Sequence, residues 1–307
     1  MVFPEAELPV IDISVLQSEL KEGDPDLQRL CNQVKEAAQQ WGAFRVVNHG
    51  VEQELLNTVD SVSRGLFSLP PQVKERAVCL PFDGYLKGVG LSSGEAICFP
   101  AVLASDSIQQ YAQKLWPQGN PEFCDSLRTY SSKLADLTNS LIKLILQGLQ
   151  LSKHFEIDFA ECEALLRLNY FSLCEKSSDA NDILLKEHTD LGVMTILYND
   201  QVAGLEMRSK QGEWFTVKPL AGSFTVIIAN ALKIWSNDRC WSVEHRVAYE
   251  GMEPRLSIGF FWNFLKEKEV RVPEELIDEH YPHRYKPFLF KDYRNARVQE
   301  APLDIFI

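Results

Sequence analysis

The change in hydrophobic period about halfway along the chain constrains its fold more than any other sequence feature. Before residue 151, apolar residues recur every three or four positions, above all over 121–151, a spacing that predicts amphipathic helices. Beyond Glu163 the pattern changes to short apolar runs separated by turn dipeptides such as Gln211-Gly212, which predict strands. Helices followed by closely spaced strands predict an α+β chain with an antiparallel sandwich or barrel of the jelly-roll kind.

The expected elements divide the chain of 307 residues into three parts of one compact unit. Residues 1–118 form an N-terminal region of helices and first strands, 119–160 a long backbone helix, and 161–307 a jelly-roll region with a C-terminal lid. Strands are expected at 8–13, 165–173, 193–197, 204–207, 214–217, 223–228, 243–249 and 256–264, and further helices at 26–38, 52–67 and 290–298. The glycine-rich segment 83–100 is expected to be an irregular loop folded over a pocket.

Charge and composition narrow the range of partners. The formal net charge is -12, and no run of Lys or Arg is long enough to follow a phosphate backbone, so we expect no nucleic-acid or membrane partner. No apolar run approaches the ~20 residues of a membrane span, and the first residues lack a signal-peptide pattern. The seven cysteines are scattered and contain no Cys-x-x-Cys pair, which predicts reduced thiols. We therefore expect a cytoplasmic monomer that acts on a small molecule.

His188, Asp190 and His245 are the candidate metal ligands. On an extended segment the side chains of His188 and Asp190 leave from the same face and can bind one ion, and His245 would complete the set. Two imidazoles and one carboxylate that leave the opposite positions open suit non-haem Fe(II), which must also bind a co-substrate and dioxygen. The same ligands also bind zinc, so a zinc hydrolase is an alternative. Its nearest candidate base, Glu187, is expected on the face opposite His188.

Arg255 and Ser257 form a second pair that shares one face of a predicted strand. A guanidinium fork beside a hydroxyl is suited to hold a carboxylate by charge-assisted hydrogen bonds. Together with the metal ligands, the pair predicts a pocket for a dicarboxylate that chelates the metal at its other end.

Nearly the whole chain resembles the plant 2-oxoglutarate- and Fe(II)-dependent dioxygenases. Residues 8–12, 41–50 and 66–75 are similar to the family's N-terminal region, and 115–117 to the entry of its long helix. The core motifs are His188-Thr189-Asp190, Trp235-Ser236-Asn237, Glu244-His245-Arg246 and Arg255-Leu256-Ser257. The resemblance implies a distorted double-stranded β-helix (jelly roll) core with flanking helices. It implies Fe(II), 2-oxoglutarate and O2 as cofactor and co-substrates, with ascorbate aiding turnover, and Asn169 beside the 2-oxoglutarate carboxylate.

Two positions depart from the family pattern. The family has Asn-Tyr-Tyr where this chain has Asn169-Tyr170-Phe171, and the second Tyr hydroxyl touches 2-oxoglutarate. Phe171 cannot make that bond, whose loss weakens co-substrate binding by about 1 kcal/mol. The family's Gly-Asp before the Trp-Ser-Asn motif is Ala229-Asn230, which removes a charge near the core strands. These departures prompt a second alternative, a redox-silent ligand-binding protein of the same fold.

Three residues are candidates for substrate contact. Arg167 precedes Asn169 and Phe171 by two and four positions, so all three should face one cavity. By resemblance to members that act on carboxylated hormones, Arg167 would pair with a substrate acid; a bond to a core carboxylate is the alternative. Tyr85 and Phe261 match substrate-contact positions of flavonoid-type members, although either could pack in the core.

The resemblance implies an enzyme of plant specialised metabolism, similar to auxin oxidases and glucosinolate-side-chain dioxygenases. It would hydroxylate or otherwise oxidise a small plant metabolite of hormone, alkaloid or phenolic type, and release succinate and CO2.

Overall fold

Two β-sheets enclose the centre of the molecule. The computed structural model describes residues 7–17, 23–79, 83–87, 94–104, 106–171, 183–248 and 253–299. The nine-stranded sheet has the order β1 (Val10–Asp12), β2 (Ala43–Val47), β11 (Ser223–Ile228), β8 (Met194–Asn199), β13 (Arg255–Phe264), β6 (Cys162–Phe171), β5 (Glu95–Phe99), β4 (Asp83–Lys87) and β3 (Val78–Cys79). The four-stranded sheet has the order β10 (Trp214–Thr216), β9 (Leu205–Arg208), β12 (His245–Ala248) and β7 (Ile183–His188). The expected jelly-roll core with flanking helices is confirmed.

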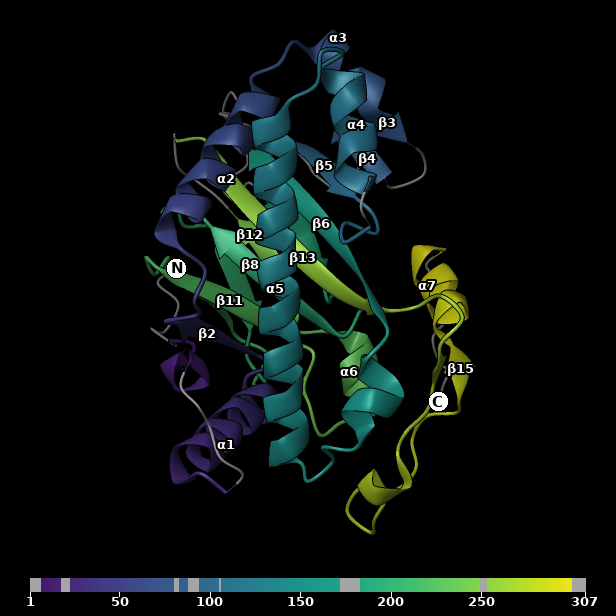
Figure 1. The fold of residues 1–307 in the computed structure, drawn as a ribbon. Helices are drawn as coiled ribbons and strands as arrows, with labels where there is room; N and C mark the ends of the chain where they lie inside the picture. The colour runs from purple at the N-terminus through teal and green to yellow at the C-terminus, as the bar shows by residue number, and fades with distance from the viewer. Residues whose placement is uncertain are drawn as a thin grey trace.

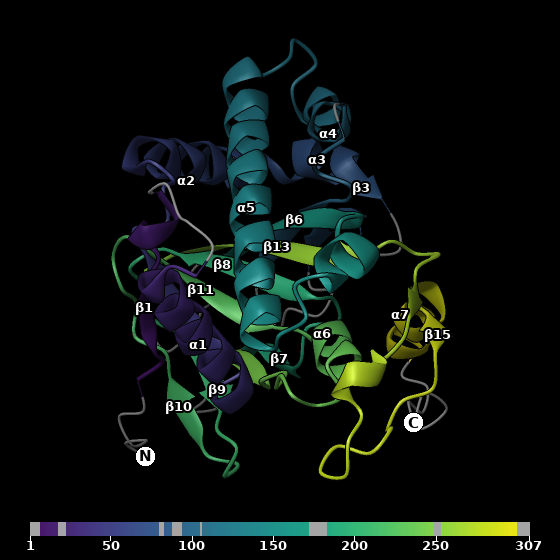
Figure 2. The ribbon, with the colours of Figure 1, turned by 60° about the horizontal axis from the view of Figure 1, so that its bottom comes forward.

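Helices cover the outer face of the large sheet. They are α1 (Pro25–Gln40), α2 (Gln53–Phe67), α3 (Pro71–Lys74), α4 (Ser107–Leu115) and α5 (Pro121–Gly148). Figure 1 shows α5 crossing in front of the sheet, and Figure 2 shows α2 above the sheet with β9 and β10 below it. The α5 helix begins where the Asn120 side chain accepts a hydrogen bond from the Phe123 N–H at 3.1 Å. Its buried leucines face the sheet, and each contributes roughly 2 kcal/mol of transfer free energy.

Alternation along the central strand β13 separates the hydrophobic core from the site. Leu256, Ile258 and Phe260 are fully buried and belong to the cluster that packs beneath the helices. The intervening residues Arg255 and Ser257 line a cavity on the other face. Because side chains alternate across a strand, one run of sequence builds both the core and the polar wall.

The glycine-rich segment 83–100 is not the irregular loop that its composition predicts. Strands β4 and β5 pair antiparallel, with Tyr85 opposite Ile97 and Leu86 opposite Ala96, and β5 continues the sheet beside β6. Glycines concealed the alternation of these two short strands, which is why the expectation was wrong. Residues 88–93, in the middle of the predicted loop, lie outside the described residues.

Two short elements carry the site. Strand β7 ends at His188, on the extended segment expected there, and the helix α6 (Asn230–Trp235), which was not predicted, follows β11. Helix α6 is too short for a helical period to be recognised in the sequence. Residues 172–182 before β7 lie outside the described part.

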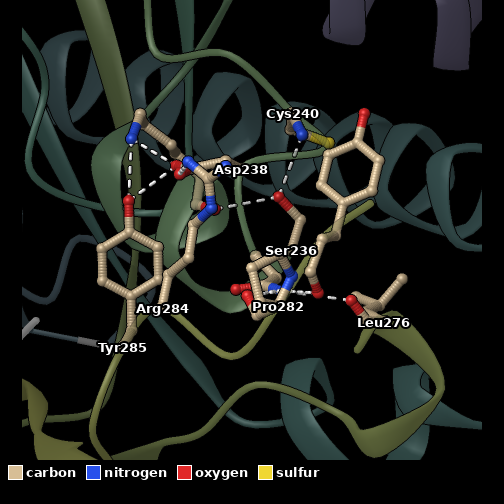
Figure 3. A network of polar contacts seen from close by, with 10 residues as sticks. Ser236, Asp238, Cys240, Leu276, Pro282, Arg284 and Tyr285 are labelled. Atoms are coloured by element: carbon tan, nitrogen blue, oxygen red, sulfur yellow. Dashed lines mark hydrogen bonds and ion pairs between the residues drawn. The ribbon is translucent and has the colours of Figure 1, made fainter. Parts of the chain in front are cut away.

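The C-terminal segment returns to α6. It contains β14 (Glu269–Val270), β15 (Phe288–Leu289) and α7 (Phe290–Val298), the last as predicted. Asp238, just beyond α6, accepts hydrogen bonds from Arg284 Nη1 at 3.0 Å and from the Tyr285 hydroxyl at 2.6 Å (Figure 3). Asn237 Nδ2 lies 3.1 Å from the carbonyl oxygen of Leu276. The return of the chain to α6 is therefore fixed by buried and half-buried polar contacts.

Candidate metal centre and co-substrate pocket

Strand pairing brings the three predicted metal ligands together. His245 of β12 is opposite His188 of β7, and Asp190 lies two residues beyond the end of β7. Asp190 Oδ1 is 3.7 Å from His188 Nε2 and 3.8 Å from His245 Nε2. Within the described part of the chain, this is the one group of three or more His, Cys, Asp or Glu residues whose ligand atoms all lie within 4.8 Å of one another.

In each of the two histidines, one ring nitrogen is hydrogen-bonded to the protein and the other faces Asp190. His188 Nδ1 is 2.8 Å from the Lys186 carbonyl oxygen, and His245 Nδ1 is 3.2 Å from that of Val243. A carbonyl oxygen only accepts, so each Nδ1 carries the proton and each Nε2 keeps its lone pair.

A hydrogen bond from a neighbouring side chain also fixes the Asp190 carboxylate. The Thr195 hydroxyl donates to Asp190 Oδ2 at 2.6 Å, which leaves Oδ1 facing the histidines. Burial, together with the neighbouring His245, lowers the pKa of His188 to about 4, so the imidazole is neutral at physiological pH. Two imidazoles whose Nε2 atoms lie near Asp190 Oδ1, and one buried carboxylate, fit a divalent iron ion.

The three residues lie in the wall of a cavity of about 510 Å³ between the two sheets. Most of the opposite wall comes from β13 and β6, which are paired so that Arg255 faces Phe171 and Ser257 faces Asn169. All four of these residues line the cavity, as does Arg167. The four predicted co-substrate residues and Arg167 therefore share one wall, in the order that the strand register dictates.

Arg255 is almost fully buried, at 1% exposure. Its Nη2 donates to Asn199 Oδ1 at 2.7 Å, and its Cζ lies 5.9 Å from the centre of the Phe171 ring. Ser257, also buried, is two positions further along β13. A buried guanidinium beside a hydroxyl at a cavity wall is suited to bind a carboxylate, because desolvation strengthens a charge-assisted hydrogen bond.

Phe171 forms an apolar part of this wall. It is buried at 1% and packs in a cluster with Leu86, Leu184 and Val247. The Gly94 backbone comes so close that a Cβ there would lie 2.8 Å from the Phe171 ring. Apolar side chains and the Gly94 backbone therefore hold the Phe171 ring in place.

Arg167 extends from the same wall toward the outer cavity. Its Nε donates to Asn169 Oδ1 at 2.7 Å, which fixes the carboxamide of Asn169. Among the described residues, no carboxylate forms an ion pair with Arg167, so the alternative of a core salt bridge finds no partner there. The positive charge of Arg167 also contributes to the lowered pKa of His188, which places it within electrostatic range of the metal ligands.

The two aromatic candidates lie in different places. Phe261 lines the cavity. Tyr85 is buried and belongs to the cluster beneath the helices, because its strand partner Ile97 faces the same way. Lys74 Nζ lies 5.7 Å from the Tyr85 ring centre, and the Tyr85 hydroxyl bonds to Glu95. Tyr85 therefore does not contribute to the cavity surface, contrary to the expectation of a substrate contact.

Sequence reasoning missed the residues that support the site from behind. Asn199 was not among the predicted site residues, and Thr195 was expected only as part of the strand 193–197. Both lie on β8, at positions 195 and 199, and so share one face of the strand. Two polar residues on one face of an otherwise apolar strand are the signal that could have found them. Asn230, whose side chain reaches Thr189, had been noted only as a lost charge.

The comparisons with known proteins agree with this geometry. Residues 162–264 match the 2OG-Fe(II) oxygenase superfamily, and residues 8–96 match the N-terminal family described as non-haem dioxygenase in morphine synthesis. Jasmonate-induced oxygenase 2 of Arabidopsis thaliana is 32% identical over 94% of this chain and 78% of that protein.

Solved structures are similar over almost the whole chain. The dioxygenase for auxin oxidation of rice is 28% identical, with a TM-score of 0.80 over 95% of each chain. The structure of JOX2 in complex with 2OG, Fe and JA is 28% identical, with a TM-score of 0.78 over 96% of this chain and 86% of that one.

A jelly roll with a His-Asp-His triad at the wall of a cavity defines a class, the mononuclear non-haem metal enzymes that bind further ligands at open metal positions. The protein belongs to the 2OG-Fe(II) oxygenase superfamily and is a 2-oxoglutarate-dependent dioxygenase. Within the described residues, no helix is long and apolar enough to cross a membrane.

Proposed function

We propose that the protein oxidises a small plant metabolite that carries an acidic group, and that Arg167 binds this group. In this proposal His188, Asp190 and His245 hold Fe(II), while Arg255 and Ser257 bind the distal carboxylate of 2-oxoglutarate. The observation that carries the choice of substrate is the Arg167 guanidinium, which lines the cavity without a carboxylate partner among the described residues.

The residues at the inner end of the cavity have distinct tasks. Fe(II), when bound, supplies the redox chemistry that couples decarboxylation of 2-oxoglutarate by O2 to oxidation of the substrate. Arg255 is held in place by Asn199, so its guanidinium keeps a fixed direction in the cavity wall. Phe171 presents a ring beside the Arg255 guanidinium and excludes water from that side.

The outer end of the cavity supplies the surface for the substrate. Arg167 lies opposite Gly259 on the paired strands, one inward-facing position further out than Asn169 and Ser257. Phe261 follows at the next inward-facing position of β13 and offers an aromatic face. Lys266 and Arg294 also line the cavity, as do the carboxylates Asp83 and Glu163, so that with Arg167 three cations stand against two anions outside the groups assigned to iron and 2-oxoglutarate. This arrangement favours an anionic molecule with a flat or apolar body.

The relatives support the same size and kind of substrate. One similar structure is the dioxygenase for auxin oxidation of rice, and another is JOX2 in complex with JA. We propose by analogy that this chain acts on a hormone-like small acid, and that hydroxylation or a related two-electron oxidation is the outcome.

A matched panel of small acids and their methyl esters tests the substrate class. The protein is incubated with Fe(II), ascorbate and 2-oxoglutarate, and substrate-dependent succinate is measured together with the mass change of each compound. We expect some acids to stimulate succinate release and their esters to fail. Arg167→Met should lower kcat/KM for these acids about 30-fold, because it removes a charged hydrogen bond worth about 2 kcal/mol. Arg271→Met, at an exposed ion pair with Glu269, is the control.

Two outcomes of that panel would contradict the proposal. Equal stimulation by acids and esters would overturn the acidic substrate and leave the oxygenase assignment intact. Turnover of an acid that Arg167→Met leaves unchanged would overturn the role of Arg167.

The alternatives from sequence differ in measurable ways. The base required for a zinc hydrolase, Glu187, is exposed and does not line the cavity. A redox-silent binding protein would bind Fe(II) and 2-oxoglutarate without consuming O2. Succinate release that requires both iron and O2 excludes both alternatives.

We further propose that the enzyme is a cytoplasmic monomer. Every residue assigned to the site comes from one chain, so the site needs no second subunit. Light scattering after gel filtration at micromolar concentration should give the mass of a single 35.0 kDa chain; a dimer mass would contradict the proposal. Fractionation of the source tissue should place the protein in the cytosol, and recovery in an organelle would contradict that location.

A further inference from the structure

Thr189, between two of the metal ligands, is held from outside the cavity. Asn230 Nδ2 donates to Thr189 Oγ1 at 2.8 Å. Arg297 Nη2 lies 3.4 Å from both the carbonyl oxygen and the Oγ1 of Thr189. His188 ends strand β7 and Asp190 follows it outside any strand, so the position of Thr189 determines how the two ligand side chains are directed.

The backbone at the start of α6 holds the same segment. The Asn230 N–H donates to the carbonyl oxygen of Asp190 at 2.9 Å, and the Ala231 N–H donates to that of Gly192 at 2.8 Å. Asn230 therefore contacts the ligand segment twice, through its main chain at Asp190 and through its side chain at Thr189. A substitution of the side chain removes the second contact and leaves the first in place.

Helix α7 completes the arrangement. The buried side chain of Tyr293 makes a hydrogen bond with the Asn230 side chain. Arg297 follows one turn later on the same helix. Phe290 and Arg294, which share this side of α7 at helical spacing, line the cavity. One short helix thus contacts both the substrate space and the segment that carries two metal ligands.

The position of α7 is itself fixed through α6. Lys233 Nζ donates to the Tyr285 hydroxyl at 2.9 Å, and Tyr285 in turn donates to Asp238 (Figure 3). These contacts hold the chain just before α7 against the helix that begins with Asn230. The C-terminal segment and the metal ligands therefore share one supporting element.

We propose that Asn230, Tyr293 and Arg297 form a clamp that positions the His188–Asp190 segment and thereby sets the affinity of the metal site. These are positioning residues, since none of them is a metal ligand. A neutral carboxamide suits this place because its Nδ2 donates to Thr189 Oγ1 and it carries no charge that would attract the guanidinium of Arg297 away from Thr189.

The test measures metal affinity rather than turnover. Asn230→Leu keeps the size of the side chain and the backbone contacts but cannot hydrogen-bond, and Arg297→Met removes the guanidinium. Apo protein is titrated anaerobically with Mn(II) by calorimetry, and its thermal unfolding is recorded without metal. Lys291→Met, which breaks an exposed ion pair with Glu267 on the same helix, is the matched control.

We expect Asn230→Leu to raise the Kd for Mn(II) about 10-fold or more, the usual effect of losing a group that orients metal ligands. Arg297→Met should raise the Kd about threefold, because its contacts with Thr189 are longer, and the control should bind as the parent does. Folded variants that bind Mn(II) within twofold of the parent would overturn the proposal and leave the contacts merely structural. If Asn230→Leu fails to fold, Arg297→Met decides by the same criterion.

The clamp rests on the proposed role of His188, Asp190 and His245 as ligands, and the two can fail separately. If His188→Ala binds Mn(II) as the parent does, the ligand assignment is wrong. If His188→Ala abolishes binding while both clamp variants match the parent, only the clamp is wrong.

Discussion

The inner and outer ends of the cavity are built on the same two strands, yet they differ in burial and pairing. At the inner end Arg255 and Ser257 are 1% and 4% exposed, and Asn199 holds the guanidinium. At the outer end Phe261 is half-buried and Lys266 is exposed. A buried charge must be paired and hydrogen-bonded, which restricts what the inner end can bind, whereas the outer end tolerates change at little cost in stability. We therefore propose that the co-substrate binds at the inner end and that the outer end determines the choice of substrate.

Removal of a metal ligand at the inner end should have the largest effect. His188→Ala leaves two of three ligands, and we expect metal affinity to fall by more than the ~100-fold upper range seen when only an orienting group is lost. Turnover of 2-oxoglutarate under controlled iron loading should fall below detection. His280→Ala, at an exposed histidine, is the control. Turnover that survives His188→Ala would show that the inner end is not the metal site.

The variant Arg255→Lys should weaken binding of 2-oxoglutarate at the inner end and leave substrate binding at the outer end unchanged. One ammonium cannot reproduce the guanidinium fork, so the KM for 2-oxoglutarate should rise about 30-fold, equivalent to about 2 kcal/mol, while the KM for the substrate changes little. Arg246→Lys, at a half-buried pair with Glu206 outside the cavity, controls for the loss of an arginine. Equal changes in both KM values would contradict the division into two ends.

The smallest effect is expected from Phe171→Tyr, which restores the hydroxyl found at this position in the family. Phe171→Tyr adds a hydroxyl beside Arg255, and one neutral hydrogen bond of about 1 kcal/mol should lower the KM for 2-oxoglutarate about fivefold. The substrate KM should stay the same. A KM for 2-oxoglutarate that rises would show that the packed wall around Phe171 has no room for the hydroxyl and that the apolar ring is itself required.

The inner end could be predicted from sequence because its residues follow a local rule. Arg255 and Ser257 lie two positions apart on one strand, and so do Asn169 and Phe171, so each pair shares a face once the strand is recognised. The prediction that Tyr85 contacts the substrate was wrong. The direction of its side chain depends on how β4 pairs with its neighbour, and this strand could not be recognised in a glycine-rich sequence. Asn230 and Arg297 could not be predicted, because their partner Thr189 is 41 and 108 positions away in the sequence. Such contacts follow only from the three-dimensional arrangement of α6 and α7.

The most direct test of the inner end is an anaerobic titration of the apo protein with Fe(II) and 2-oxoglutarate, followed by optical absorption. We expect a weak visible charge-transfer band that requires both additions, is absent in Arg255→Lys at low 2-oxoglutarate, and disappears on exposure to O2 with formation of succinate. If the parent protein gives neither the band nor succinate at saturating Fe(II) and 2-oxoglutarate, the assignment of His188, Asp190, His245 and Arg255 is contradicted.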